Sequence, residues 1–203
     1  MPSSTQRSRA GSRCSRVPGL PRNNMDASRC GRWEALLASK PALHPALLDE
    51  IYRHAAEAYP NECCGFVRLN GEVHRAVNYQ DALHAEDPAL WPHTSRAAYS
   101  LAPDDLYLLG MSFLSHFPAI VVYHSHPDSG AYFSDKDIAG ALFEGRPLYD
   151  VDHLVIDVRR GRPQGAKLYR FVNARYRCVW SDAVRRGAVR QTAARLGRFD
   201  RRV

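Results

Sequence analysis

Residues 119–127 read Ala-Ile-Val-Val-Tyr-His-Ser-His-Pro, an apolar run that ends in two histidines. The continuous apolar stretch from Ala119 to Tyr123 predicts a central strand that is covered on both faces of a sheet. His124 and His126 are two residues apart, and in extended backbone such side chains point to the same side. The sequence therefore predicts two neighbouring imidazoles at the end of a buried strand, where the chain enters a loop and functional sites are common.

A helix is predicted on each side of this strand. Pro103 followed by two aspartates is typical of a first helical turn, so we expect a helix from Pro103 to about His116. After the strand, a polar loop over 125–133 leads to Ser134, which we expect to cap a helix that ends near Phe143.

The remaining elements alternate in type around this centre. We expect a helix over 45–59, strands over 65–69 and 72–78 joined at Asn70-Gly71, a short strand over 97–101, and strands over 151–159 and 166–172. The segment 80–97 is expected to be irregular. This order predicts an α/β fold in which a mixed sheet is sandwiched by helices.

Charge separates the chain into three parts. Residues 1–24 contain five arginines and no acid, and residues 175–203 contain nine arginines and two aspartates, whereas residues 25–174 are net acidic by five charges. We therefore expect a basic, disordered extension over 1–40, a folded domain over 41–174, and a basic tail over 175–203 with a helical segment from Asp182 to Leu196. Such tails would add only weak, salt-sensitive affinity for nucleic acid.

The composition argues against a membrane or a secreted protein. No apolar run approaches the roughly 20 residues that cross a bilayer, and no apolar stretch follows the N-terminus as in a signal peptide. Five scattered cysteines do not resemble a disulfide framework. The expected compartment is the reducing cytoplasm.

Asp137 adds a carboxylate to the histidine pair. It lies at the start of the next predicted helix, one loop away from the strand end. Two histidines and one carboxylate leave one tetrahedral position for water, as in a catalytic zinc site. Alternatively, the histidines are ordinary surface residues, and Ser134 to Asp137 is a helix capping box. The cap and the metal site are compatible, because a cap does not use both carboxylate oxygens.

Glu62 lies at the predicted junction between the first helix and the first strand. Its local sequence does not distinguish it from a solvated surface acid, which is the usual place of a glutamate.

Two separated motifs together resemble one family. The pattern His124-x-His126-Pro127, six residues, Ser134-x-x-Asp137 is similar to the motif of the JAMM (MPN+) zinc metalloproteases, without a gap. Residues 60–65, Pro-Asn-Glu-Cys-Cys-Gly, are similar to the upstream Glu-x-Cys-Gly segment of that family.

This likeness covers about residues 43–173 and is closer to the short prokaryotic members than to eukaryotic deubiquitinases, whose insertions are missing. The two basic tails and the paired Cys63-Cys64 depart from the family pattern but leave the motif intact.

The resemblance implies a cytidine-deaminase-like JAB/MPN fold and one zinc ion per chain. His124, His126 and Asp137 would bind the metal. Glu62 would transfer protons, and Ser134 would donate a hydrogen bond to the tetrahedral oxyanion.

The resemblance also implies a reaction: cleavage of a peptide or isopeptide bond, often after the C-terminal glycine of a ubiquitin-like or sulfur-carrier protein. Two alternatives remain, a small-molecule amidohydrolase on the same scaffold and a non-catalytic MPN scaffold. The intact Glu62, Ser134 and ligand set argue against the scaffold, because a scaffold needs none of them. The substrate is not evident from the sequence, since specificity lies in loops such as 79–96.

Overall fold

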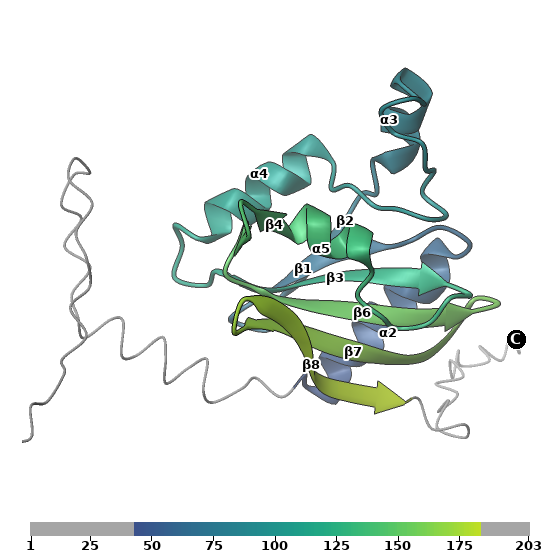
Figure 1. The fold of residues 1–203 in the computed structure, drawn as a ribbon. Helices are drawn as coiled ribbons and strands as arrows, with labels where there is room; N and C mark the ends of the chain where they lie inside the picture. The colour runs from purple at the N-terminus through teal and green to yellow at the C-terminus, as the bar shows by residue number, and fades with distance from the viewer. Residues whose placement is uncertain (1–42, 184–203) are drawn as a thin grey trace, which may run out of the picture. The chain divides into compact units, whose positions relative to one another are not determined.

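A computed structural model describes residues 43–183. Its centre is a six-stranded sheet in the order β2-β1-β3-β6-β7-β8 (Figure 1). The strands of this sheet are β1 (Cys64–Arg68), β2 (Val73–Ala76), β3 (Ala119–Pro127), β6 (Asp152–Arg159), β7 (Arg162–Val172) and β8 (Arg175–Ala183). β3 and β6 run parallel, and the other neighbouring strands are antiparallel. The sheet is therefore mixed, as the sequence predicts.

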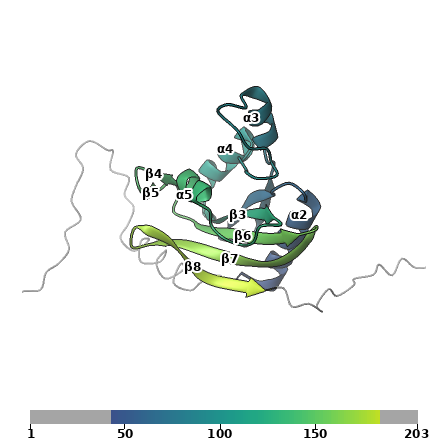
Figure 2. The same cartoon turned by 45° about the vertical axis from the view of Figure 1, so that its right-hand side comes forward.

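Four helices and a small hairpin complete the described part of the chain. The helices are α2 (Pro45–Ala58), α3 (Gln80–Glu86), α4 (Pro103–Ser112) and α5 (Asp135–Ala141), and β4 (Leu142–Phe143) pairs with β5 (Arg146–Pro147). Figures 1 and 2 show α2 on one face of the sheet and α4 and α5 on the other. The predicted arrangement of a sheet between helical layers is confirmed.

The face covered by α2 contains the larger apolar core. Ile51 and Ala55 of α2 are fully buried and pack in one cluster with Val121 and Tyr123 of β3. Burial of one large aliphatic side chain contributes about 1.5–3 kcal/mol, so this cluster anchors the middle of β3.

The opposite face contains a smaller apolar cluster and leaves room for polar groups. Leu109 of α4 packs there with Phe66 of β1 and Val122 of β3. Because side chains alternate along a strand, His124 and His126 lie on the same face as Val122. The sheet therefore directs both histidines toward α4 and α5.

Two expectations for the elements before β3 need correction. Residues 80–86, expected to be irregular, form α3, and the expected strand over 97–101 is reduced to one bridge between Asn78 and Leu101. The helix α4 also ends at Ser112, four residues before the predicted end.

The predicted C-terminal boundary is also wrong. Residues 175–183, assigned to a basic tail, form β8, which pairs antiparallel with β7. Tyr176 and Trp180 are partly buried in this strand, and these two aromatic side chains explain why a basic segment joins the sheet. The helix expected from Asp182 therefore does not begin there, and its continuation lies outside the described residues, as does the extension 1–40.

Within residues 43–183, no helix is long and apolar enough to cross a membrane.

Candidate metal centre

The two histidines lie within β3 rather than beyond its end. His124 is opposite Cys64 of β1 on one side and opposite Val155 of β6 on the other. His124 is fully buried, and His126 is 5% exposed. Both side chains therefore project from the middle of a six-stranded sheet, which fixes their backbones and excludes the alternative of surface histidines.

Three ligand atoms meet in front of this strand. The Nε2 atoms of His124 and His126 are 3.1 Å apart, and each lies 3.4 Å from Oδ2 of Asp137. Ligand atoms about 2.0–2.1 Å from a tetrahedral zinc ion lie about 3.3 Å from one another. The three residues therefore form a group able to hold a metal ion, with spacing that fits zinc.

The Asp137 carboxylate faces both histidines and also takes part in the capping box of α5 with Ser134. The Ser134 hydroxyl lies 2.7 Å from Asp137 Oδ2 and accepts a hydrogen bond from the Asp137 backbone N–H at 3.1 Å. The Ser134 backbone N–H donates to the same Oδ2 at 2.8 Å. The capping box is thus present together with the ligand geometry, and it fixes the carboxylate oxygen that faces both imidazoles.

The electrostatics of the group favour a negative Asp137 beside the histidines. Burial raises the pKa of Asp137, but contacts with His124 and His126 outweigh it and hold that pKa well below its usual range. Burial lowers the pKa of His124, whereas contacts with Asp137, Glu62 and Gly130 overcome burial and raise the pKa of His126. Neutral imidazole is the form that binds metal, and complete burial favours it at His124.

Glu62 is a buried residue, which excludes the alternative of a solvated surface acid. Only 6% of its surface is exposed, and none of the described residues hydrogen-bonds to its carboxyl oxygens. Burial raises its pKa to about 7; the neighbouring charge of His126 lowers this pKa and that of Asp137 raises it. The carboxyl group is thus near the ligand group and free to exchange a proton near neutral pH.

The backbone around Glu62 is fixed from both sides. Its N–H donates to the Ser95 carbonyl at 2.7 Å, and its carbonyl accepts from the Asn78 amide at 2.9 Å. One residue later, the Cys63 N–H donates to the Ser125 hydroxyl of β3 at 2.9 Å. The bond from Cys63 joins the residue before β1 to β3, and together these bonds place Glu62 beside the strand that contains His124 and His126.

Gly65 explains why the upstream motif ends in glycine. A Cβ atom at this position would collide with the His74 carbonyl and with the Tyr123 ring, which lies opposite it on β3. Because Gly65 has no side chain, the backbone of β2 and the Tyr123 ring can approach β1 closely, three residues after Glu62.

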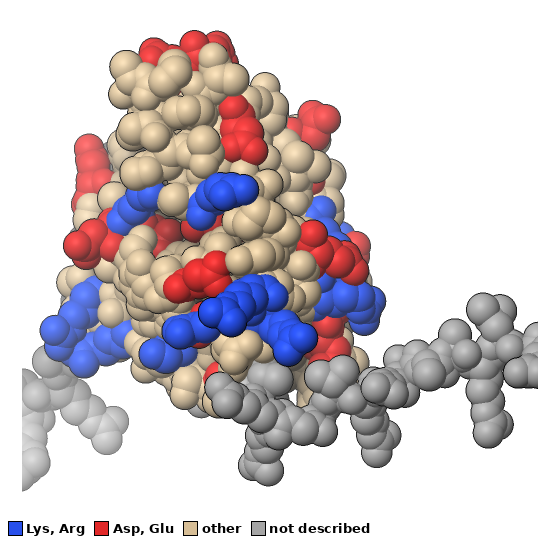
Figure 3. All heavy atoms as spheres, turned by 90° about the vertical axis from the view of Figure 1, so that its right-hand side faces the viewer, with Lys and Arg blue, Asp and Glu red and all other residues tan. Residues whose placement is uncertain are grey.

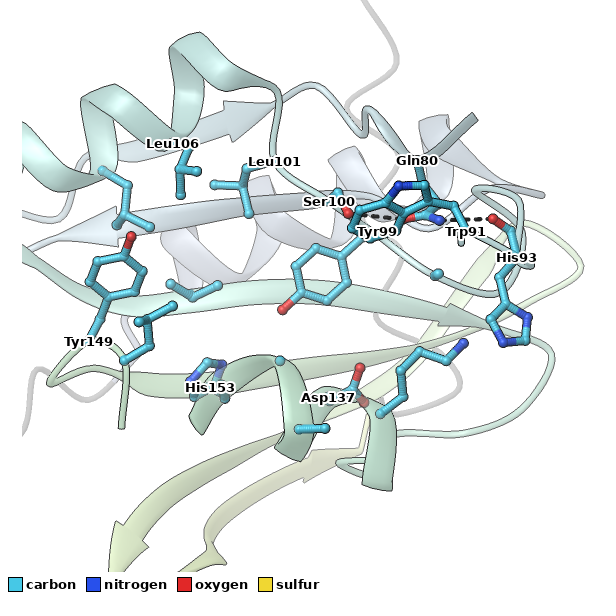
Figure 4. A pocket seen from close by; sticks show the side chains of 18 of the residues that line it. Gln80, Trp91, His93, Tyr99, Ser100, Leu101, Leu106, Asp137, Tyr149 and His153 are labelled. Carbon is cyan, nitrogen blue, oxygen red and sulfur yellow. Dashed lines mark hydrogen bonds between the residues drawn. The ribbon is translucent and has the colours of Figure 1, made fainter. Parts of the chain in front are cut away.

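An apolar groove of about 610 Å³ opens beside Asp137. Figure 4 shows Tyr99, Leu101 and Leu106 on one wall and Asp137 on the opposite helix, with His153 below. Gln80 closes one end through hydrogen bonds to the His93 carbonyl and the Ser100 hydroxyl. The groove thus lies between α5 on one side and α4 with the segment that precedes it on the other.

An aromatic cluster anchors the loop between the ligands. The Phe133 ring lies 4.9 Å from His153, 5.4 Å from Tyr169 and 4.8 Å from Tyr176, measured between centroids. The Tyr169 hydroxyl also donates to the Ala131 carbonyl at 3.0 Å. These partners of Phe133 come from β6, β7 and β8, so the sequence around Phe133 does not predict them.

Outside the site, the surface is of mixed charge. Figure 3 shows Lys and Arg side chains interspersed with Asp and Glu on the face at the right of Figure 1. In the lower part of this view several Lys and Arg side chains adjoin one another, with Asp and Glu side chains beside them.

Comparison with known proteins gives the family. A family model for prokaryotic homologues of the JAB domain matches residues 44–165. The tail tip assembly protein K of Escherichia phage N15 is 31% identical over 118 residues, which make up 58% of this chain and 43% of that protein. The chain therefore spans less than half of the length of this curated relative.

Two solved structures resemble the chain more loosely. A protein from Desulfitobacterium hafniense has a TM-score of 0.47 and 19% identity, over 66% of this chain and 86% of that one. A protein from Salinibacter ruber has a TM-score of 0.41 and 27% identity, over 71% and 91%. The family match itself covers more than half of the chain and includes every residue from Glu62 to Asp137, and the chain therefore belongs to the prokaryotic homologues of the JAB domain.

Proposed function

We propose that this chain is a zinc-dependent hydrolase that cleaves a peptide or isopeptide bond. The observation that carries this proposal is the triangle of His124 Nε2, His126 Nε2 and Asp137 Oδ2 beside a buried Glu62. A fixed group of three ligands with one open tetrahedral position is the pattern of catalytic zinc, whereas structural zinc sites are closed by four protein ligands.

One zinc ion per chain would be held by His124, His126 and Asp137. Zinc in this position would supply a Lewis acid that activates water and polarises the carbonyl of the cleaved bond. The ligand chemistry supports zinc, because imidazole nitrogen and carboxylate oxygen are both common zinc ligands.

Glu62 would act as the general base and then as the general acid. Its carboxylate would accept a proton from the attacking water and would deliver it to the leaving amine. A pKa of about 7 suits both steps, because the group then gains and loses a proton at little cost near neutral pH.

Ser134 would donate a hydrogen bond to the developing oxyanion. In the structure its hydroxyl lies 2.7 Å from Asp137 Oδ2, so its proton is available to that oxygen. The catalytic role requires the hydroxyl to turn from Asp137 toward the substrate, while the Ser134 backbone N–H continues to hold the carboxylate.

The groove supports an extended polypeptide substrate. It runs between α5 on one side and α4 with the segment before it on the other and opens at Asp137, so a chain end lying in it would reach the ligand group. We propose that the substrate is a ubiquitin-like or sulfur-carrier protein cleaved after its C-terminal glycine. A small-molecule amide that fits the same groove is the alternative substrate.

A non-catalytic assembly role is the second candidate function. It is favoured by the name of the phage relative, a tail tip assembly protein, which is similar to more than half of this chain. A scaffold would have no use for a buried Glu62 without a hydrogen-bond partner among the described residues, since such burial destabilises its charged form.

The proposal is tested with the zinc-loaded protein and a ubiquitin-like sulfur carrier that is extended beyond its terminal Gly-Gly. Mass spectrometry should detect cleavage after the second glycine, and chelation of zinc should stop it. Cleavage of small amides alone would select the amidohydrolase. A zinc-bound protein that cleaves neither substrate would contradict the hydrolase and favour the assembly role.

A further inference from the structure

The two metal-binding histidines are supported in different ways. His126 Nδ1 lies 3.1 Å from the Gly130 carbonyl, so its N–H donates there and Nε2 is left for the metal. His124 Nδ1 is buried, and none of the described residues offers it a hydrogen bond. Metal-binding histidines usually owe their ring orientation to such a bond. The orientation of His124 therefore needs another cause.

Tyr99 makes a contact that can orient the His124 ring. Its ring stacks on the His124 imidazole with centroids 4.5 Å apart and planes 22° from parallel. Stacking opposes tilting of the imidazole out of its plane, which would carry Nε2 away from Asp137. Aromatic pairs contribute about 0.5–1.5 kcal/mol beyond the area that they bury.

The neighbour of His126 makes a weaker restraint. Tyr132 meets the His126 ring edge-on, with centroids 4.9 Å apart and an interplanar angle of 65°, and it is 48% exposed. Because the bond to Gly130 already orients His126, this contact is not needed to hold the ring.

We propose that Tyr99 is a positioning residue that sets the orientation of His124 by stacking, in place of the missing hydrogen bond at Nδ1. The proposal rests on the proposed metal centre but not on hydrolysis. Tyr99 also lines the groove, so the ring that stacks on His124 forms part of the groove wall as well (Figure 4).

The test compares zinc affinity in full-length variants, by competition with a chromophoric chelator. Tyr99→Leu removes the aromatic ring and should weaken zinc binding about tenfold, within the 10- to 100-fold range found for lost outer-shell partners. Tyr99→Phe keeps the ring and should bind zinc within twofold of the natural protein. Tyr132→Leu is the matched control and should also stay within twofold.

A second measurement separates positioning from general damage. Long-range ¹H–¹⁵N NMR of the zinc-loaded protein reports the ring nitrogens of each histidine. In Tyr99→Leu the His124 signals should broaden or shift while the His126 signals stay in place. If Tyr99→Leu does not fold, Tyr99→Met provides the same comparison.

Equal zinc affinity in Tyr99→Leu and the natural protein would overturn the proposal, and so would equal losses in Tyr99→Leu and Tyr132→Leu. Absence of zinc binding in the natural protein would instead contradict the metal centre itself, and thus the proposed function.

Discussion

Glu62 combines burial with a carboxyl group that no described residue hydrogen-bonds, and it lies beside three residues with metal-ligand geometry. Neither property follows from its local sequence. The backbone bonds to Ser95 and Asn78 that bury it come from segments 33 and 16 residues away. The proposed role of Glu62 is therefore predictable only from the family pattern, whereas the position of His124 and His126 on one side of a strand follows from their spacing of two residues.

At this residue we predict that Glu62→Gln abolishes turnover and spares zinc and fold. Gln keeps the size of the side chain but cannot accept a proton, and loss of a positioned general base costs about 10²–10⁴ in rate. Rates on the extended sulfur carrier and zinc content by mass spectrometry provide the measurement. The control is Glu72→Gln, because Glu72 is an exposed residue of the β1–β2 turn. Near-normal hydrolysis with zinc bound would remove Glu62 from the mechanism, and loss of zinc would make it a ligand.

Glu62 should also give the metal-free protein a pH-dependent stability. Burial raises its pKa from an ordinary value of 4.5 to about 7, so the folded protein binds this proton more tightly than the unfolded chain. The stabilisation is fully present below pH 4.5 and is lost as the pH rises through 7. At 1.36 kcal/mol per pKa unit, the loss amounts to about 3 kcal/mol.

The measurement is urea unfolding of the metal-free natural protein and of Glu62→Gln between pH 4.5 and 8. The natural protein should lose stability relative to the variant as the pH rises. Parallel stability curves for the two proteins would show that the carboxyl group does not titrate in this range.

At the scale of elements, β8 connects the C-terminal segment to the site. The Tyr176 ring packs against Phe133, in the loop between β3 and α5, with centroids 4.8 Å apart. It also packs against His153 of β6 with centroids 5.3 Å apart. The strand lies beyond the residues that the family model matches, which end at residue 165.

We predict that Tyr176→Ala lowers stability by about 1–3 kcal/mol and weakens zinc binding, because the loop before Ser134 loses one of its anchors. Tyr176→Phe should preserve both properties, since the ring makes the aromatic contacts and the hydroxyl makes only a long contact of 3.5 Å with His153 Nε2. Urea unfolding and zinc competition are the measurements. Arg177→Ala, an exposed change in the same strand, should stay within about 0.5 kcal/mol. A Tyr176→Ala protein with unchanged zinc affinity would separate β8 from the site.

The predictable elements are those whose sequence pattern and burial agree. The continuously apolar run from Ala119 to Tyr123 predicts the first part of β3. Its extension to Pro127 is not predictable, because residues 125–127 belong to a polar segment that becomes a strand only by pairing with β6. α3 has no side-chain cap and few apolar residues, so its seven residues gave no helical signal. β8 was missed because its exposed arginines obscure the two inward-facing aromatic residues.

At the scale of the whole molecule, the change of charge at residue 175 does not mark the end of the fold, because β8 lies in the basic segment. The basic excess belongs to residues 1–24 and 175–203, whereas residues 25–174 are net acidic. The central part contains the other five strands of the six-stranded sheet, both helical layers and all five candidate site residues.

We therefore predict that deletion of residues 1–24 leaves folding and hydrolysis intact, because that segment has no apolar periodicity to bury. Melting temperature and turnover of the shortened and full chains should agree. A fall of several degrees in melting temperature would show that the segment packs on the domain.

The central claim is that His124, His126 and Asp137 form a zinc site, and metal content tests it most directly. The purified full chain should retain one zinc per chain after dialysis, measured by mass spectrometry, because three fixed ligands release the ion slowly. The double variant His124→Ala/His126→Ala should retain none, while the control variant His116→Ala, at an exposed position, should retain the full amount. Stoichiometric zinc in the double variant, or a natural protein that cannot be loaded with zinc, would contradict the account.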